Sequence, residues 1–199
     1  MAQAHRETNL WLWLGGISGA VAPPLTLSLI IYTIAISPWF NWHRDALSDL
    51  GVREHALLFN GALAINGVLS ILAALGVGAL LGRGWLTRAG VGAMVTGALG
   101  VGLISVITQE YGAPHFWLAA AYFILTPLGY LLLAPAMFRQ GRGVMGTLSI
   151  AAGVAAILLI LLLPHEGIAV PELAASLILA AWTFSLGVEM LSRVCRREA

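Results

Sequence analysis

The stretch Asn41-Trp42-His43-Arg44-Asp45-Ala46-Leu47-Ser48-Asp49-Leu50-Gly51 is the longest polar interruption in an otherwise strongly apolar sequence. It separates two long apolar runs. Each run can cross a bilayer, because a hydrocarbon layer of ~30 Å needs ~20 helical residues. Of all 199 residues, 59% are hydrophobic and only 10% are charged. A soluble domain carries charge on roughly a quarter of its residues, so we predict an integral membrane protein.

Outward from this stretch, polar and basic loops divide the rest of the chain into further apolar runs. We predict one all-α domain over residues 1–199, an integral membrane six-helix bundle with no separate soluble domain. The expected spans are residues 10–36, 56–81, 89–108, 116–137, 144–163 and 172–191.

The arginines predict how these spans are oriented, since the chain contains no lysine. One side of the predicted bundle carries Arg6, Arg83, Arg88, Arg139, Arg142, Arg193, Arg196 and Arg197, and the other only Arg44 and Arg53. Loops rich in basic residues face the cytoplasm. We therefore expect a multi-pass protein of the cell membrane with both termini cytoplasmic and three acidic loops facing outward.

Acids and histidines gather in or beside those outward loops: Asp45, Asp49, Glu54, Glu110, Glu166, Glu172, His43, His55, His115 and His165. A solvated outer surface is one interpretation, because loops are where polar residues ordinarily lie. A functional pocket is the other. If residues 44–50 are helical, Asp45 and Asp49 share a face at i,i+4 and could bind a cation or position a base. Equally, Asp45 or Ser48 could cap a helix that Gly51 ends.

A metal site is a further hypothesis for this side of the membrane. His115 begins the fourth span, and His165 lies beside Glu166 at the end of the fifth. Two or three imidazoles with a carboxylate would bind a divalent metal such as zinc and leave a position for water, and we expect His115 and Asp49 among the ligands. No HExxH or other fixed spacing supports it. Asn60 lies just inside the outer boundary, where an unpaired amide is costly, so we expect it to bind a neighbouring helix, the outer loop or a ligand.

The motif Ala46-Leu47-Ser48-Asp49-Leu50-Gly51, followed by Phe59-Asn60-Gly61, resembles the prokaryotic membrane-protein family catalogued as domain of unknown function 998. The likeness extends through Glu110-Tyr111-Gly112 with His115 and through Ile168-Ala169-Val170-Pro171-Glu172. It implies a compact helical bundle in the cell membrane and no established activity. The residues that match are Ser48, Asp49, Asn60, Glu110, His115 and Glu172, and His43, His55 and His165 fall outside the pattern.

Two classes of function remain open. The first is a membrane-embedded hydrolase or lipid-modifying protein. In it His115 acts as general base or metal ligand, and Asp49 and Glu110 orient it or share the metal. Ser48 would position the substrate or act as nucleophile, and Asn60 and Glu172 would bind the substrate.

The second class is a protein that binds lipid headgroups or cations without chemistry, or a structural membrane partner. Permeation is disfavoured, because the deep parts of the six predicted spans carry no acids. In both classes we expect membrane lipids as partners and no nucleic acid. The glycine-rich spans are compatible with one bundle or with an oligomer.

Overall fold

The computed structural model describes residues 2–162 and 167–198, with side chains from residue 8 to residue 196 outside the gap. Its helices are α1 (Ala2–Ala35), α2 (Ala56–Leu81), α3 (Trp85–Leu103), α4 (Ala113–Arg139), α5 (Gly143–Leu162) and α6 (Ala169–Glu198), with short 3₁₀ helices η1 (Leu47–Val52) and η2 (Gln109–Tyr111). The described residues form no strand. All six α-helices are long and apolar enough to cross a membrane. The all-α, multi-pass prediction is therefore confirmed.

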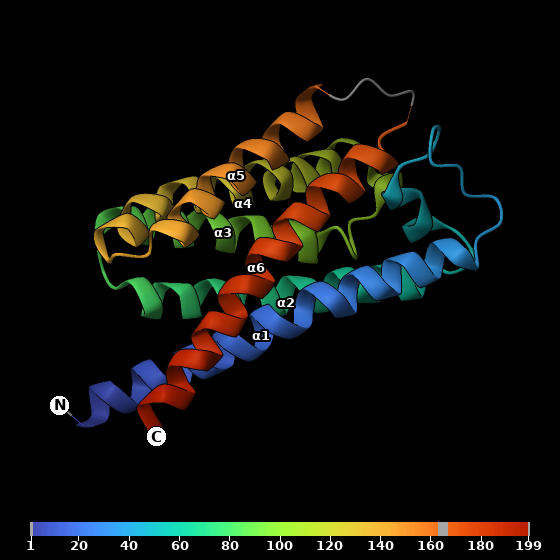
Figure 1. The fold of residues 1–199 in the computed structure, drawn as a ribbon. Helices are drawn as coiled ribbons and strands as arrows, with labels where there is room; N and C mark the ends of the chain where they lie inside the picture. The colour runs from blue at the N-terminus through green and yellow to red at the C-terminus, as the bar shows by residue number, and fades with distance from the viewer. Residues whose placement is uncertain (1, 163–166, 199) are drawn as a thin grey trace.

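The six helices run up and down beside one another, and each packs against the next along the chain (Figure 1). The ring closes because α6 packs against α1. Both termini consequently lie at the same end of the bundle. We call this end, with the loops around residues 82–84 and 140–142, the basic end. The opposite end, which carries residues 36–55 and 104–112, is the acidic end.

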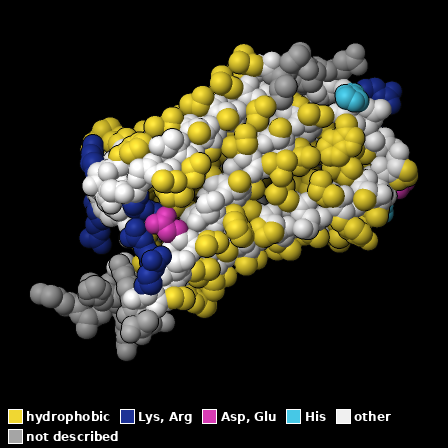
Figure 2. All heavy atoms as spheres, in the orientation of Figure 1, with side chains coloured by type: hydrophobic (Ala, Val, Ile, Leu, Met, Phe, Trp, Pro, Cys, Tyr) yellow, Lys and Arg dark blue, Asp and Glu magenta, His cyan; other side chains and the backbone are white. Residues whose placement is uncertain are grey.

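The surface of the bundle also differs between its two ends and the long face that joins them. Hydrophobic side chains cover the long face of the bundle between the two ends (Figure 2). Arginines gather at the basic end, beside the termini (Figure 2). Two of the arginines at this end, Arg142 and Arg193, form ion pairs with Glu189. This distribution is the one that a bilayer-spanning bundle requires, because lipid tails cannot solvate charge.

Paired glycines let the helices approach closely. A Cβ on Gly15 would lie 2.6 Å from the Cα of Gly76 in α2, and one on Gly19 would lie 3.1 Å from the Cα of Gly187 in α6. Lipid tails are as apolar as the helices, so contact between backbones, rather than a hydrophobic driving force, holds such helices together. Gly15 and Gly19 therefore bring α1 into close contact with α2 and α6.

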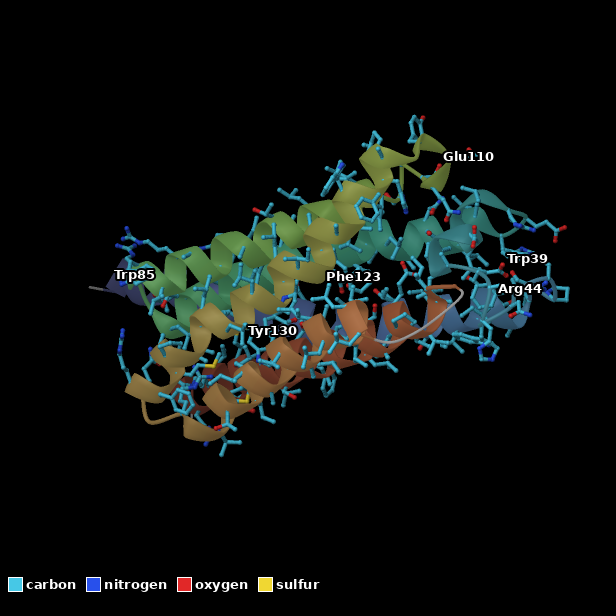
Figure 3. All side chains as sticks on the ribbon, turned by 90° about the horizontal axis from the view of Figure 1, so that it is seen from above. Trp39, Arg44, Trp85, Glu110, Phe123 and Tyr130 are labelled. Carbon is cyan, nitrogen blue, oxygen red and sulfur yellow. The ribbon has the colours of Figure 1, made fainter. Side chains whose placement is uncertain are left out.

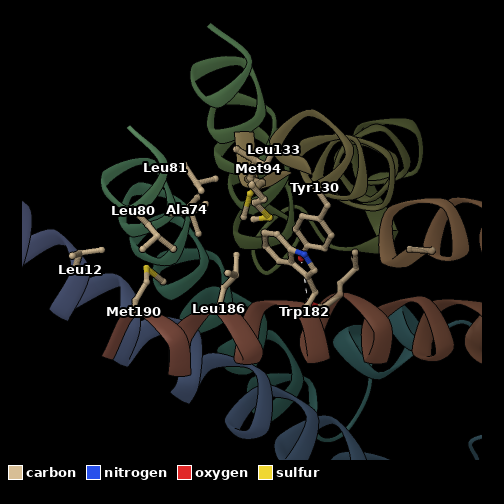
Figure 4. Close-up of a cluster of buried hydrophobic side chains, with 14 of the residues drawn as sticks. Leu12, Ala74, Leu80, Leu81, Met94, Tyr130, Leu133, Trp182, Leu186 and Met190 are labelled. Carbon is tan, nitrogen blue, oxygen red and sulfur yellow. Dashed lines mark hydrogen bonds between the residues drawn. The ribbon is translucent and has the colours of Figure 1, made fainter. Parts of the chain in front are cut away.

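The half of the bundle nearer the basic end is filled by large side chains (Figure 4). Tyr130 of α4 stacks on Trp182 of α6 with ring centroids 3.6 Å apart. The polar group of each ring forms a hydrogen bond: the Tyr130 hydroxyl donates to Leu179 O, and the Trp182 indole N–H donates to Ser149 Oγ. A buried aromatic pair with satisfied polar groups closes the bundle interior from the basic end.

Some helix ends differ from the predicted spans. The third helix is Trp85–Leu103 rather than 89–108, because the chain leaves the helix in turns after Leu103 and the Ser105 hydroxyl donates to Gly102 O at 2.6 Å. Helices α1 and α6 extend past residues 10 and 191 into polar sequence. Hydropathy locates the part of a helix that is apolar and not the residue at which its backbone hydrogen bonds stop.

Candidate functional site

Residues 41–52, which we call the cap, lie at the acidic end. The hypothesis of one helix over residues 44–50 is wrong, because the chain turns at 41–44 and starts the 3₁₀ helix η1 only at Leu47. Asp45 Oδ2 accepts a hydrogen bond from Asn41 N at 2.7 Å, whereas Asp49 Oδ2 accepts one from Ala46 N at 2.7 Å. Each carboxylate closes its own turn, so the two acids do not form the shared helical face that their spacing suggested.

Asp49 also connects the cap to η2. Its Oδ1 accepts a hydrogen bond from Gln109 Nε2 at 2.7 Å, and Gln109 Oε1 accepts one from the Ser48 hydroxyl at 2.6 Å. Both carboxylate oxygens of Asp49 are therefore engaged, and the proton of Ser48 points to an amide rather than to a base. The sequence analysis did not single out Gln109, which is 60 residues away from Asp49.

Two more polar contacts fix the cap to the helices beneath it. Glu172, in the first turn of α6, accepts a hydrogen bond from Leu47 N through Oε2 at 2.8 Å. Asn60 of α2 donates from Nδ2 to Gly51 O at 2.9 Å. The sequence left a neighbouring helix, the outer loop or a ligand as possible partners of Asn60, and the observed partner belongs to the outer loop.

Below the cap lies a cavity of about 90 Å³, which we call the axial cavity. A cavity needs ~10–15 Å³ to hold one water, so several waters or a small molecule fit. Its lining residues come from α1, η1, α2, α3, α4 and α6. Helix α5 contributes none and packs outside, against α4 and α6. Ser48, His115 and Glu172 lie on its wall toward the acidic end, and Tyr130 lies on its wall toward the basic end.

Polar side chains continue into this cavity on helices that are otherwise apolar. They are Thr26 on α1, Asn66 and Ser70 on α2, Tyr122, Thr126 and Tyr130 on α4, and Ser176 and Thr183 on α6. The hydroxyls of Thr26 and Thr126 are buried and have no hydrogen-bond partner among the described residues. The sequence prediction assigned none of these residues to a site, although the four-residue spacing on α2 and α4 places each set on one helix face.

His115 of α4 is buried at the acidic end of the cavity. Its Nδ1 lies 2.8 Å from the carbonyl oxygen of Ile107. A carbonyl oxygen can only accept, so Nδ1 carries the proton, and in the neutral ring Nε2 is a bare acceptor. The chain itself thus fixes the tautomer of this imidazole.

The family model described as protein of unknown function DUF998 matches residues 20–189. The chain belongs to this family. No curated protein and no solved structure matches the chain. The family description gives no activity, so the chemistry of this DUF998 protein has to be argued from its own residues.

Of the six candidate residues in this DUF998 chain, the structure brings Ser48, His115 and Glu172 together on the cavity wall. Asp49 and Asn60 make the cap contacts and do not line the cavity. Glu110 is exposed in η2 at the acidic end (Figure 3).

The metal hypothesis finds no support in the part of the chain that the structure describes. Within residues 2–162 and 167–198, no three His, Cys, Asp or Glu side chains come together as a metal would require. His165 and Glu166, which the hypothesis also named, lie outside the described residues.

Proposed function

We propose that this DUF998 protein binds a small molecule in the axial cavity and does not convert it chemically. The observation that carries the proposal is the cavity's lining. It combines the buried hydroxyls of Thr26 and Thr126 with Nε2 of His115, and none of these three atoms has a hydrogen-bond partner among the described residues. A buried hydroxyl without a partner costs free energy, which a bound polar molecule or water would recover.

Hydrolysis receives less support from the same geometry. A nucleophile or general base needs an atom free to reach the substrate. Of the predicted catalytic residues, only His115 keeps an acceptor at the cavity wall, because Asp49 uses both oxygens in the cap, Ser48 donates to Gln109, and Glu110 is exposed away from the cavity. An alcohol nucleophile would need a base beside it, and the hydrogen bond of Ser48 goes to an amide oxygen instead.

The experiment compares two neighbouring alanines of α6. Ala180 lines the axial cavity, whereas Ala181 is exposed and lines an apolar groove between α5 and α6. Protein purified in mild detergent is analysed by native mass spectrometry for bound small molecules. We expect the wild type and Ala181→Phe to carry a bound species that Ala180→Phe lacks. Equal occupancy in all three proteins, or no bound species in the wild type, would contradict the proposal.

For the orientation, we propose the cell membrane with both termini in the cytoplasm. The support is the concentration of arginines at the end where the termini lie. Cys195, the only cysteine, is exposed at this end in α6 and provides the test. A membrane-impermeant maleimide should label it in inverted vesicles and not in intact cells. Labelling in intact cells would show that the orientation is the opposite of the proposed one.

A further inference from the structure

We propose that the molecule bound in the axial cavity is an organic ammonium ion, whose N–H groups donate to Glu172 and to His115. This inference rests on the proposed binding function and names the chemical class of its ligand. It follows from three features of the cavity. They are a buried carboxylate with no cationic partner among the described residues, a second acceptor in His115, whose tautomer is fixed, and a lining without arginine or lysine.

Glu172 is the decisive residue. It is only 9% exposed, and its Oε2 accepts the hydrogen bond from Leu47 N. No hydrogen bond or ion pair to Oε1 occurs among the described residues, where the two acid–arginine pairs both involve Glu189 at the basic end. A buried carboxylate without a cationic partner is costly. A positively charged ligand would lower that cost.

The arginines of the acidic end do not serve as that partner. The guanidinium of Arg53 lies 4.2 Å above the ring of Trp39. Neither Arg53 nor Arg44 lines the axial cavity, and neither forms an ion pair within the described part of the chain. Within the described residues, the carboxyl group of Glu172 therefore has no arginine partner and is available to a ligand.

His115 adds a second acceptor on the same cavity wall, because its Nδ1–H is committed to the carbonyl of Ile107. A protonated primary amine presents three N–H donors and no acceptor, which suits a site with two acceptors. Bonds from a cationic donor to a carboxylate are the stronger kind of hydrogen bond.

The rest of the lining separates an organic cation from other ligands. Aromatic rings of Phe59, Tyr122 and Phe123 provide contacts for a carbon body and an attractive π face for a cation. A metal ion would need more charged ligands than Glu172 and His115 supply. An anion such as a phosphate headgroup would meet Glu172 with no lysine or arginine on the cavity wall. The lining thus favours a small amine with an apolar part.

Three probes of equal size test this: butylammonium, 1-butanol and butyrate, added to the purified full chain in detergent and measured by saturation-transfer NMR titration. We expect butylammonium to bind at least about tenfold more tightly than 1-butanol, since a charge-assisted bond adds a kcal/mol or more to a neutral one and about 1.4 kcal/mol is tenfold. Butyrate should not bind.

The matched variants are Glu172→Gln and Glu110→Gln. The glutamine at 172 keeps an oxygen for Leu47 N but removes the charge, so butylammonium should lose about tenfold in affinity and 1-butanol should bind unchanged. Glu110 is exposed and lies off the cavity, so Glu110→Gln should leave both affinities as in the wild type.

The outcomes distinguish the two proposals. If 1-butanol binds as tightly as butylammonium and Ala180→Phe blocks both, the cavity is a binding site and the ammonium inference is wrong. If no probe binds and Ala180→Phe changes nothing, the proposed function itself fails. The comparison of three probes on the wild type decides the ammonium inference even where Glu172→Gln does not fold.

Discussion

Asp49→Asn should lower stability without removing ligand binding. The carboxylate accepts two hydrogen bonds at 2.7 Å, from Ala46 N and Gln109 Nε2. An asparagine can keep both contacts if the amide of Gln109 turns over, so that the new amide N–H₂ donates to Gln109 Oε1 and Gln109 Nε2 donates to Ser48 Oγ. The number of hydrogen bonds is then unchanged, and the loss is the charge assistance of two bonds.

That loss can be estimated. Hydrogen bonds to charged groups contribute about 1.5–3 kcal/mol and neutral ones about 1 kcal/mol, so two partly buried bonds should lose roughly 1–2 kcal/mol together. Asp49→Ala leaves both donors, Ala46 N and Gln109 Nε2, without an acceptor and should lower the free energy of unfolding by about 2–4 kcal/mol. Asp45→Asn is the matched control. Asp45 accepts one local bond, from Asn41 N, and an asparagine can still accept it, so about 0.5 kcal/mol is expected.

The assay is reversible unfolding of the purified protein by increasing SDS fraction in mixed micelles, together with the butylammonium titration. We expect the order wild type, Asp45→Asn, Asp49→Asn, Asp49→Ala in decreasing stability, with affinity retained by each folded protein. The reasoning is refuted if Asp49→Asn is as stable as the wild type and has lost its ligand. That result would make Asp49 a binding or catalytic residue rather than part of the cap.

The same unfolding titration checks two further predictions. Gly15→Ala should lower the free energy of unfolding by about 1–3 kcal/mol, because its Cβ would lie 2.6 Å from the Cα of Gly76. Gly61→Ala is the control: its Cβ would have nothing within 4 Å, so its stability should stay within about 1 kcal/mol of the wild type. Equal effects of the two substitutions would argue against the packing explanation. Glu189→Gln should lower the free energy of unfolding by about 1–3 kcal/mol, because it removes the charged partner of the buried Arg142 side chain. Ligand binding should be unchanged. An unaltered stability would show that the ion pair makes no net contribution to stability.

The sequence predicted the fold well where a helix end coincides with a change in polarity. Helix α2 runs from Ala56 to Leu81 as expected, because polar His55 precedes it and Gly82, with a φ of 83°, ends it. Such a φ is accessible to glycine and strained for other residues. Helix α3 was placed wrongly at both ends. It begins at Trp85, within the stretch expected to be a loop, and its apolar sequence continues past Leu103 while the backbone turns.

The candidate site was predicted less well, since its contacts are set by tertiary structure. Spacing alone put Asp45 and Asp49 on one face, but each carboxylate is satisfied by an amide within its own turn. The partner of Asp49 is Gln109, from a loop that spacing arguments cannot bring near. Family resemblance also pointed to Asp49, yet such a resemblance does not separate a residue that holds the cap from one that contacts a ligand.

The polar residues inside the cavity were missed for a different reason. Acids inside a span are the usual sign of a polar path through a membrane, and the deep parts of the predicted spans carry none. Tyr122, Thr126 and Tyr130 are uncharged and do not give this sign, although their spacing places them along one face of α4. Uncharged polar residues repeated at four-residue spacing are therefore a useful sign of an internal cavity in a membrane bundle.

Glu172 joins the cap to the cavity, and this has a measurable consequence. Its Oε2 holds Leu47 N in the cap, while the proposed ammonium ion would use Oε1 from the cavity side. Opening of the cap would break the first contact and let water reach the carboxylate, so an ammonium ion should bind the closed cap more tightly. Cap closure and ligand binding both use Glu172, so each should favour the other by the same free energy.

The expected linkage can be measured by hydrogen exchange at the amide of Leu47. A ligand that binds only the closed state stabilises it by RT ln(1 + [L]/Kd), which is about 1.4 kcal/mol at ten times Kd. Butylammonium at that concentration should therefore slow exchange at Leu47 about tenfold, if exchange proceeds through opening of the cap. The amide of Gly82, at the basic end and bonded to Gly78 O, is the control and should not change. Equal exchange at Leu47 with and without saturating butylammonium would show that the cap and the ligand use Glu172 independently.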